Sequence, residues 1–340
     1  MNGDLVVLGG GSWGTTLASL AAQQCSTVLW ARSEQIACEV ADRHTNERYL
    51  PGIALSPSLR AESDLARALS GAGAVLVGVP SHGARGVLEQ AAPMIANGTP
   101  VFSLSKGIED GTALRMSQVI ADVVPHAVTG VVTGPNLARE IAAGQPAASL
   151  VACEDEASAE IVQQVLHSGS FRAYISTDVI GCEIAGVTKN VLAIAAGIAD
   201  GFGFGQNTRA LLITRGLAEM GRLGMSLGGH TLTFGGLAGV GDLVATCTSD
   251  KSRNRAVGVA LGQGRELAEI IESMHMVAEG VKSAGPLSRI ARDAGVGMPI
   301  CEEVAAIVAG TTTPQQALAS LMERPARGEW NGLNAIHGAG

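Results

Sequence analysis

Lys189 is the charged residue with the most unusual surroundings in this sequence. It lies in the segment Ile184–Ile194, which is apolar on nearly every face of a predicted helix and is therefore expected to be buried. A lysine in such a helix needs a partner or a water-filled cleft. One interpretation is that its ammonium reaches solvent along the protein surface. The other is a catalytic cation, which stabilises a carbonyl oxygen as it gains charge and donates a proton to it.

Three further groups of polar residues could bind an anion or assist that chemistry. Lys106 follows the predicted strand Val101–Leu104, at the end where open parallel sheets bind ligands, although a surface lysine is the alternative. The basic segment Thr248–Arg255 precedes the predicted helix Ala256–Leu261, where positive charge opposes the helix dipole unless an anion is bound. A solvated basic patch is the plainer interpretation of that segment. Asp242 is expected either to cap a helix or to orient a catalytic lysine.

A glycine-rich segment, GGGSWG, lies between the predicted strand Leu5–Leu8 and the predicted helix Trp13–Gln24 and fits the G-x-G-x-x-G pattern. Gly9 permits a tight turn, Gly11 lets backbone N–H groups approach a pyrophosphate, and Gly14 allows the helix to pack closely on the strand. The N-terminus of the helix then offers unpaired N–H donors to the phosphates. An ordinary glycine-rich turn is the alternative, but the strand–turn–helix context favours dinucleotide binding.

The end of the second predicted strand bears on the choice of dinucleotide. Sites selective for NAD usually carry an acidic residue there, which holds the ribose 2′-hydroxyl. Here the strand Thr27–Trp30 is followed by Arg32, whose guanidinium can pair with a 2′-phosphate. The sequence therefore predicts that NADPH is accepted and preferred, whereas the nearby Glu34 leaves NADH as the alternative.

The elements that position these residues change character along the chain. Aliphatic runs alternate with helical patterns up to about residue 176, which predicts a largely parallel sheet, and helical patterns follow from Asp178 to Arg324. We expect an α/β dinucleotide-binding domain over residues 1–178, an all-α substrate-binding and catalytic domain over residues 179–330, and a weakly ordered tail over residues 331–340. The predicted strands are Leu5–Leu8, Thr27–Trp30, Ala74–Val79, Val101–Leu104, Ala127–Val132, Ala148–Ala152 and Phe171–Ile175.

Composition excludes several classes of function. Charged residues make up 16% of the 340 residues and the net charge is −8, which argues against disorder and against general binding of nucleic acids or membrane surfaces. The six cysteines form no CxxC pair and the seven histidines show no metal-ligand spacing, so we expect reduced thiols in a cytoplasmic protein without a metal. The segment Val191–Ala199 is rich in small residues and is expected to be a core helix.

Motifs along nearly the whole chain resemble those of the NAD(P)-dependent glycerol-3-phosphate dehydrogenase family of bacterial type. The first half contains GGGSWGTTLA, NERYLPGI, SLSKGIE and GPNLAREIAAGQP, in the order expected for that family. The second half contains KNVLAIAAGIADGFGFGQNTRALLITRGLAEM, GLAGVGDLVATCTSDKSRNRAVG and MVAEGV. The segment that begins at Lys189 and the SRNR segment carry the resemblance more specifically than the glycine-rich turn.

The resemblance implies a role for individual residues. Lys189 would be the catalytic proton donor in reduction and acceptor in oxidation, and Asp242 its carboxylate partner, both also in contact with substrate. Lys106 would be a third catalytic residue, in contact with both cofactor and substrate. The other substrate-binding residues implied are Gly134, Asn136, Ser252, Arg253 and Asn254. The cofactor-binding residues implied are Gly9, Gly11, Ser12, Trp13, Gly14, Arg32, Tyr49, Lys106, Ala138, Arg253, Val277 and Glu279.

The function that these observations predict is reversible reduction of dihydroxyacetone phosphate to sn-glycerol 3-phosphate by NAD(P)H, which would supply the backbone of glycerophospholipids. One alternative is a related two-domain reductase that acts on another small anion, such as a hydroxy acid. Another is a non-catalytic protein that senses a dinucleotide. The expected partner is a small phosphorylated substrate, with neither nucleic acid nor stable membrane association, and the apolar helices of the second half are compatible with a homodimer.

Overall fold

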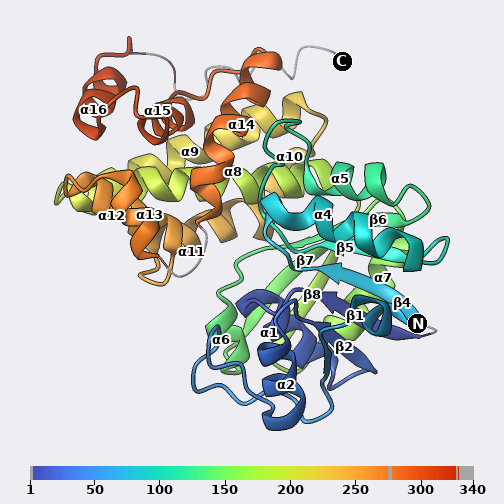
Figure 1. The fold of residues 1–340 in the computed structure, drawn as a ribbon. Helices are drawn as coiled ribbons and strands as arrows, with labels where there is room; N and C mark the ends of the chain where they lie inside the picture. Colours follow the sequence, from blue (N-terminus) through green and yellow to red (C-terminus); the bar gives the residue numbers. More distant parts are fainter. Residues whose placement is uncertain (1–2, 275–277, 327, 329–340) are drawn as a thin grey trace. The chain divides into compact units, whose positions relative to one another are not determined.

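A computed structural model describes residues 3–274, 278–326 and 328 of the chain. The chain divides into two compact units (Figure 1). Unit 1 comprises Met1–Lys106 and Leu114–Val179, and unit 2 comprises Gly107–Ala113 and Ile180–Gly340. The short segment Gly107–Ala113 therefore groups with the later part of the chain, an assignment that the sequence pattern does not indicate.

Unit 1 contains an eight-stranded sheet in the order β3-β2-β1-β4-β5-β6-β7-β8. Neighbouring strands are parallel except for the antiparallel pair β6 and β7. This confirms the predicted α/β fold, although the three-residue strand β3 was not predicted. The strands are β1 (Asp4–Leu8), β2 (Thr27–Trp30), β3 (Arg60–Glu62), β4 (Ala72–Val77), β5 (Pro100–Ser103), β6 (Val128–Thr133), β7 (Ala147–Cys153) and β8 (Phe171–Ser176).

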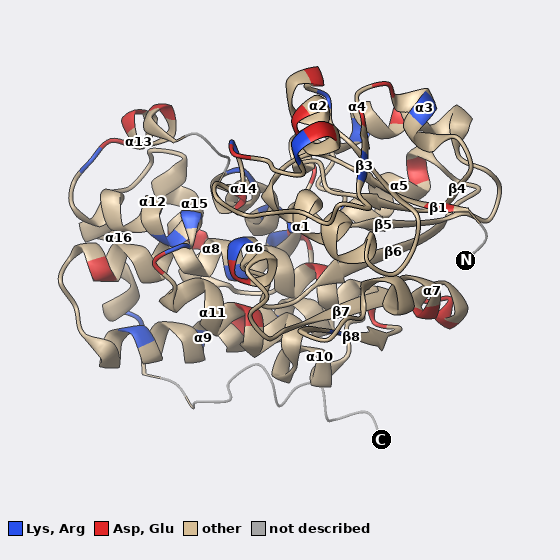
Figure 2. Ribbon diagram, turned by 90° about the horizontal axis from the view of Figure 1, so that it is seen from below, with Lys and Arg blue, Asp and Glu red and all other residues tan. Residues whose placement is uncertain are grey.

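Helices cover both faces of this sheet because its strands are apolar on both faces (Figure 1). In β1, Leu5 and Val7 join the core beneath α1, α2 and α7, whereas Val6 and Leu8 join the core beneath α3, α4 and α5. The central strands β4 to β7 carry no charged residue (Figure 2). The helices of unit 1 are α1 (Ser12–Ala21), α2 (Glu34–Arg43), α3 (Leu65–Leu69), α4 (Ser81–Ala91), the 3₁₀ turn η1 (Ala92–Met94), α5 (Met116–Val123), α6 (Ala138–Ala142) and α7 (Glu156–Leu166).

Unit 2 has no strand among its described residues, which confirms the helical second half that the sequence predicts. Its longest helix is α8, and this helix is long and apolar enough to cross a membrane. However, 89% of its most apolar 18-residue window is buried inside the fold, as expected for a core helix. The elements are α8 (Val179–Gly201), α9 (Gln206–Ser226), α10 (Thr231–Gly235), the π-helical segment η2 (Leu237–Gly241), α11 (Asp242–Thr248), α12 (Arg253–Gly262), α13 (Leu267–Ser273), α14 (Glu279–Asp293), α15 (Pro299–Val308) and α16 (Pro314–Met322). The predicted tail over residues 331–340 lies outside the described residues.

Glycines allow α8 and α12 to pack backbone against backbone. A Cβ atom on Gly197 of α8 would lie 2.1 Å from the Arg255 carbonyl oxygen, and one on Gly258 of α12 would lie 2.1 Å from the Ile194 carbonyl oxygen. Gly201 and Gly262 make the same kind of contact one turn further along. No larger residue fits at this crossing, so the four glycines fix the distance between the two helices.

A buried carboxylate joins α9 to α15. Glu219 accepts hydrogen bonds from the backbone N–H groups of Ile300 (2.8 Å) and Cys301 (3.2 Å), in the first turn of α15. These groups have no partner within their own helix, so Glu219 satisfies donors that would otherwise be buried unpaired. Burial raises the pKa of Glu219 to about 7, although the two N–H bonds and Arg222 oppose that shift.

The raised pKa of Glu219 predicts a pH dependence of stability. From the ordinary carboxyl pKa up to about pH 7, the folded protein retains a proton that the unfolded chain releases, so the free energy of unfolding falls as pH rises through this window. The loss should approach about 3 kcal/mol. In Glu219→Gln, which cannot ionise, the contribution should disappear. Urea unfolding of both proteins between pH 5 and 8 measures the difference, and equal slopes against pH would contradict it.

Candidate functional site

The glycine-rich turn has the geometry of a phosphate cradle. Gly9 follows β1 with a φ of 125°, a conformation that favours glycine. A Cβ atom on Gly14 would lie 2.2 Å from the Gly9 carbonyl oxygen, so α1 packs directly on the turn. A Cβ atom on Gly11 would meet nothing within 4 Å, which leaves open space above the backbone. Gly11 is also the N-cap of α1 and offers no side chain, so the N–H groups of the first turn, which begins at Ser12, are available to an anion.

Residues distant in the sequence support this turn. Asn46 donates from Nδ2 to the Gly10 carbonyl oxygen (3.0 Å) and to Thr15 Oγ1 (2.9 Å). Trp13 packs edge-on against Phe171, with 6.4 Å between the ring centroids, and its Nε1 is buried without a hydrogen-bond partner in the described structure. A buried N–H of this kind fits a site whose remaining partner is a ligand.

Two other predicted cofactor residues lie on segments next to the glycine-rich turn. Ala138 begins α6, and its carbonyl oxygen accepts a hydrogen bond from Thr16 Oγ1 of α1 (3.3 Å). Tyr49 packs against the core that α1 and α2 share, and the Arg48 guanidinium lies 5.6 Å from the centroid of its ring.

Arg32 lies immediately after β2, in the turn that precedes α2, and its side chain is exposed. Glu34 is also exposed and is the first residue of α2. The carboxyl end of β2 thus presents a guanidinium that is free to contact a phosphate, with one carboxylate nearby.

Lys106 and Gly134 come together at the carboxyl ends of the neighbouring strands β5 and β6. The Lys106 ammonium donates a hydrogen bond to the Gly134 carbonyl oxygen at 2.6 Å. Gly134 has a φ of 132°, which a larger residue would adopt only with strain. Asn136 donates to the Ala148 carbonyl oxygen (3.3 Å), and its own Oδ1 is buried without a partner in the described structure. The structure thus groups three of the predicted substrate residues beyond the carboxyl ends of the central strands β5 and β6.

Lys189 is buried and paired in unit 2. It is 7% exposed, and its Nζ lies 3.1 Å from Asp242 Oδ1 and 2.8 Å from Thr246 Oγ1. Thr246 in turn donates to Asp242 Oδ1 at 3.2 Å, so its hydroxyl accepts from the ammonium and donates to the carboxylate. The surface-lysine interpretation is therefore wrong, because the ammonium does not reach solvent but finds an internal partner. Asp242 does not cap α11 either, because Gly241 holds the N-cap position and Asp242 begins the helix.

This cluster provides a cation in a protected environment. Asp242 is 1% exposed, so water screens the pair only weakly and a nearby carbonyl oxygen would feel the ammonium strongly. The neighbouring Cys247 is not a second reactive group, because burial raises the pKa of its thiol to about 12. The π-helical segment η2 immediately precedes Asp242, and such segments occur frequently at functional sites.

The SRNR segment forms the N-terminus of α12. Ser252 is the N-cap, and its hydroxyl accepts a hydrogen bond from the Arg255 backbone N–H at 3.3 Å. Asn254 donates to Asn190 Oδ1 (2.9 Å) and accepts from the Gly280 N–H (2.9 Å), so it links α8 to the start of α14. Asn254 is therefore a structural link between these helices.

Arg253 and Glu279 also come together in unit 2. The Arg253 residue is exposed overall, but partial desolvation of its guanidinium lowers its pKa, and the nearby Glu279 carboxylate opposes that shift. Glu279 begins α14. The remaining predicted cofactor residue, Val277, lies outside the described residues.

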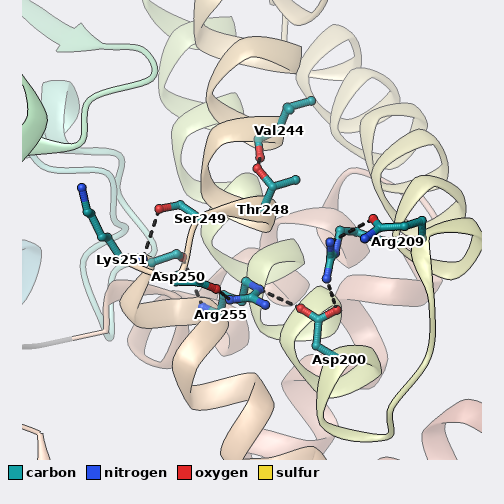
Figure 3. Close-up of polar contacts among 10 residues, drawn as sticks. Asp200, Arg209, Val244, Thr248, Ser249, Asp250, Lys251 and Arg255 are labelled. Atoms are coloured by element: carbon teal, nitrogen blue, oxygen red, sulfur yellow. Dashed lines mark hydrogen bonds and ion pairs between the residues drawn. The ribbon is translucent and has the colours of Figure 1, made fainter. Parts of the chain in front are cut away.

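Arg255 is held by carboxylates. Asp200 of α8 binds both Arg255 (2.7 Å) and Arg209 (2.6 Å), and Arg255 also binds Asp250 at 2.7 Å (Figure 3). Lys251 points away from these ion pairs (Figure 3). Arg255 thus anchors α12 to α8 through Asp200.

Sequence reasoning missed three polar residues that the structure brings to these clusters. Thr246 could have been found from its spacing, because it follows Asp242 by four residues and so lies on the same face of α11. Asn190 adjoins Lys189 in the sequence, and its side chain binds Asn254. Apart from its place in the motif NERYLPGI, the sequence does not indicate a role for Asn46. Its contacts are with Gly10 and Thr15, more than thirty residues earlier.

Two sequence profiles of one family match the chain. The profile described as NAD-dependent glycerol-3-phosphate dehydrogenase N-terminus matches residues 4–159, and the corresponding C-terminus profile matches residues 178–319. Together they span most of the described chain.

Individual relatives are similar over almost their whole lengths. A glycerol-3-phosphate dehydrogenase [NAD(P)+] of Sphingopyxis alaskensis is 50% identical over 317 residues, which are 93% of this chain and 95% of that protein. A second, from Mycobacterium tuberculosis, is 47% identical over 337 residues, which are 99% of this chain and 97% of that protein.

Solved structures show the same similarity. The crystal structure of glycerol-3-phosphate dehydrogenase from Coxiella burnetii has a TM-score of 0.90 and 37% identity, and the match covers 95% of this chain and 99% of that one. The ketopantoate reductase of Ralstonia eutropha has a TM-score of 0.56 at 14% identity over 93% of this chain and 99% of that one, a similarity of fold alone. The chain therefore belongs to the NAD-dependent glycerol-3-phosphate dehydrogenase family.

Proposed function

We propose that this protein is an oxidoreductase that reversibly reduces dihydroxyacetone phosphate to sn-glycerol 3-phosphate with NAD(P)H. The observation that carries the proposal is the buried Lys189 ammonium, held by Asp242 and Thr246 in a chain whose relatives of this activity are similar over their full length. Burial of a charged group in a core is unfavourable, so the charge is expected to have a function. In carbonyl reduction, the ammonium would stabilise the negative charge that develops on the oxygen.

The residues of unit 1 fit a nicotinamide dinucleotide. The open space above Gly11, the uncapped N-terminus of α1 and the unpartnered Nε1 of Trp13 suit a pyrophosphate and its neighbouring groups. When bound, the reduced cofactor supplies the hydride of the reaction. Ser12, Tyr49 and Ala138 would contact it from unit 1. The resemblance also assigns Arg253 and Glu279 to the cofactor.

The chain's own residues would orient the substrate and move its proton. Lys189 stabilises the oxygen that gains charge and donates a proton to it, while Asp242 and Thr246 hold the ammonium in position. Lys106, Gly134 and Asn136 would bind polar atoms of the substrate. Arg253, Asn254 and the start of α12 would bind its phosphate, because a helix N-terminus favours negative charge.

The cofactor preference follows from Arg32. An exposed guanidinium after β2, where NAD-selective sites carry an acid, favours the additional phosphate of NADPH. We therefore assign NADPH as the preferred reductant, with NADH used less efficiently.

The cellular role that fits this reaction is supply of the glycerol phosphate backbone for phospholipid synthesis by a cytoplasmic enzyme. The net charge of −8 supports a protein that binds neither nucleic acid nor anionic membranes stably. Exposed apolar side chains on unit 2, including Leu232 and Ile271, are compatible with a homodimer.

Removal of the Lys189 ammonium should abolish most of the activity. We expect Lys189→Ala to lower kcat for dihydroxyacetone phosphate at least about 10²–10³-fold, the usual cost of losing a group that stabilises transition-state charge. NADPH affinity should remain close to that of the wild type, because the glycine-rich turn belongs to unit 1. Stopped-flow kinetics and fluorescence titration with NADPH measure the two quantities, and near-normal turnover would refute the role of Lys189.

Thr246 should influence the rate through Lys189. Thr246→Val keeps the shape of the side chain but removes the hydroxyl between ammonium and carboxylate, so kcat should fall about tenfold, in keeping with one hydrogen bond to a charged group. Thr246→Ser retains the hydroxyl and should stay within about threefold of the wild type. If the two variants lose equal activity, the effect comes from packing and not from the hydrogen bond.

Arg32 provides a test of cofactor preference. Arg32→Ala should raise KM for NADPH at least about tenfold through loss of a charge-assisted contact, and should leave KM for NADH nearly unchanged. Glu34→Gln, a neighbouring exposed residue, serves as the matched control and should not raise KM for NADPH. Equal effects of Arg32→Ala on both cofactors would remove the argument for NADPH.

A further inference from the structure

A large apolar groove lies within unit 2, apart from the Lys189 cluster. It has a volume of about 1110 Å³ and is formed by α8, α9, α15 and α16. Three large apolar side chains on its lining are exposed, namely Phe204 (40%), Leu211 (54%) and Met322 (73%). A cavity of this size reaches the upper end of the range for small-molecule sites, and apolar walls are typical of such sites.

The lining of the groove is graded in polarity along α9. At the beginning of the helix it consists of Thr208, Leu211 and Leu212, whereas Arg215, Glu219 and Arg222 follow on the same face. These residues recur at intervals of three or four, so they form one stripe along the helix. The groove therefore has an apolar end and a charged end.

The opposite wall has the same polarity. Leu318 and Leu321 of α16 contribute apolar surface, and Arg324 follows the end of that helix. Burial lowers the pKa of Arg222; Glu219 opposes this shift, while the neighbouring Arg215 and Arg324 lower it further. Arg222 therefore lies near both of the other guanidinium groups, and this cluster in the lining favours a ligand with negative charge.

The two carboxyl groups of the described lining, Glu219 and Glu303, also make hydrogen bonds to other residues. Glu219 directs both oxygens to the N-terminus of α15, and Glu303 accepts a hydrogen bond from Ser320 at 2.5 Å. Arg222 donates to the Gly297 carbonyl oxygen at 3.1 Å, which fixes its guanidinium at the wall of the groove. Among the described lining residues, three guanidinium groups thus outnumber two carboxyl groups.

We propose that this groove binds a long-chain acyl carboxylate, with the chain along the apolar wall of α9 and α16 and the carboxylate at Arg215, Arg222 and Arg324. A planar carboxylate matches the fork of a guanidinium group, and a single alkyl chain matches an elongated apolar wall. The proposal concerns a second site and does not depend on the proposed reaction.

Calorimetric titration of the full-length protein with saturated carboxylates of 8, 10, 12 and 14 carbons, each below its micelle concentration, tests the site. We expect one molecule bound per chain and an affinity that rises up to about fourfold for each added methylene. The alcohol of equal length should bind at least about tenfold more weakly, because it lacks the charge.

Matched variants locate the binding. Leu211→Asp places a charge on the apolar wall and should abolish binding, whereas Leu232→Asp alters a still more exposed leucine that does not line the groove and should not. Arg324→Ala should weaken binding about tenfold, and Arg265→Ala, an exposed arginine that does not line the groove, should have no effect. Unchanged thermal unfolding of each variant shows that the fold is intact.

Three results would overturn the proposal. The first is absence of saturable binding, or binding that Leu211→Asp and Arg324→Ala leave intact. The second is a dimer in sedimentation that Leu211→Asp dissociates, with no carboxylate bound, since the groove would then be an interface between copies of this chain. The third is binding only after residues 329–340 are removed, since the chain's own end would then be the occupant.

Discussion

The helical unit is organised around the burial of a single ammonium group. Removing a lysine from water costs several kcal/mol unless an opposite charge and hydrogen bonds replace the lost solvation. Asp242 supplies the charge and Thr246 the connecting hydroxyl, and both come from the short helix α11. Lys189 is 7% exposed and Asp242 1% exposed, so little water competes for the pair. Because water screens this pair only weakly, the proposed role of Lys189 toward a carbonyl oxygen fits the same arrangement that makes the residue unfavourable to bury.

A second constraint is the distance between α8 and α12. The glycine pairs at their crossing bring the backbones into contact, and Asp200 ties α8 to Arg255 beyond the start of α12. Asn254 then connects α12 to Asn190, the residue after Lys189. Because these links are short, the N-terminus of α12 and Lys189 have a fixed geometry within one unit, as the proposed orientation of a phosphorylated substrate would require.

The sequence predicts most helices and strands in which apolar residues recur with a regular spacing. It does not predict β3, because Arg60 and Glu62 lie on an edge strand that needs little apolar surface, or α6, which has only five residues. Nor does it show that β7 runs antiparallel to β6, since an apolar run reports burial and not direction. Lys189 stands out in the sequence because its surroundings are apolar. Its partner Thr246 is 57 residues away, and only the fold brings such residues together.

The most direct test of the account is the reaction of the purified protein with dihydroxyacetone phosphate, followed by the loss of NADPH and NADH absorbance in separate assays. The account predicts loss that depends on dihydroxyacetone phosphate and equals the glycerol 3-phosphate formed, faster with NADPH. Folded protein that binds the dinucleotide but consumes neither cofactor would contradict it. The chain would then act on another carbonyl compound or sense the dinucleotide without turnover.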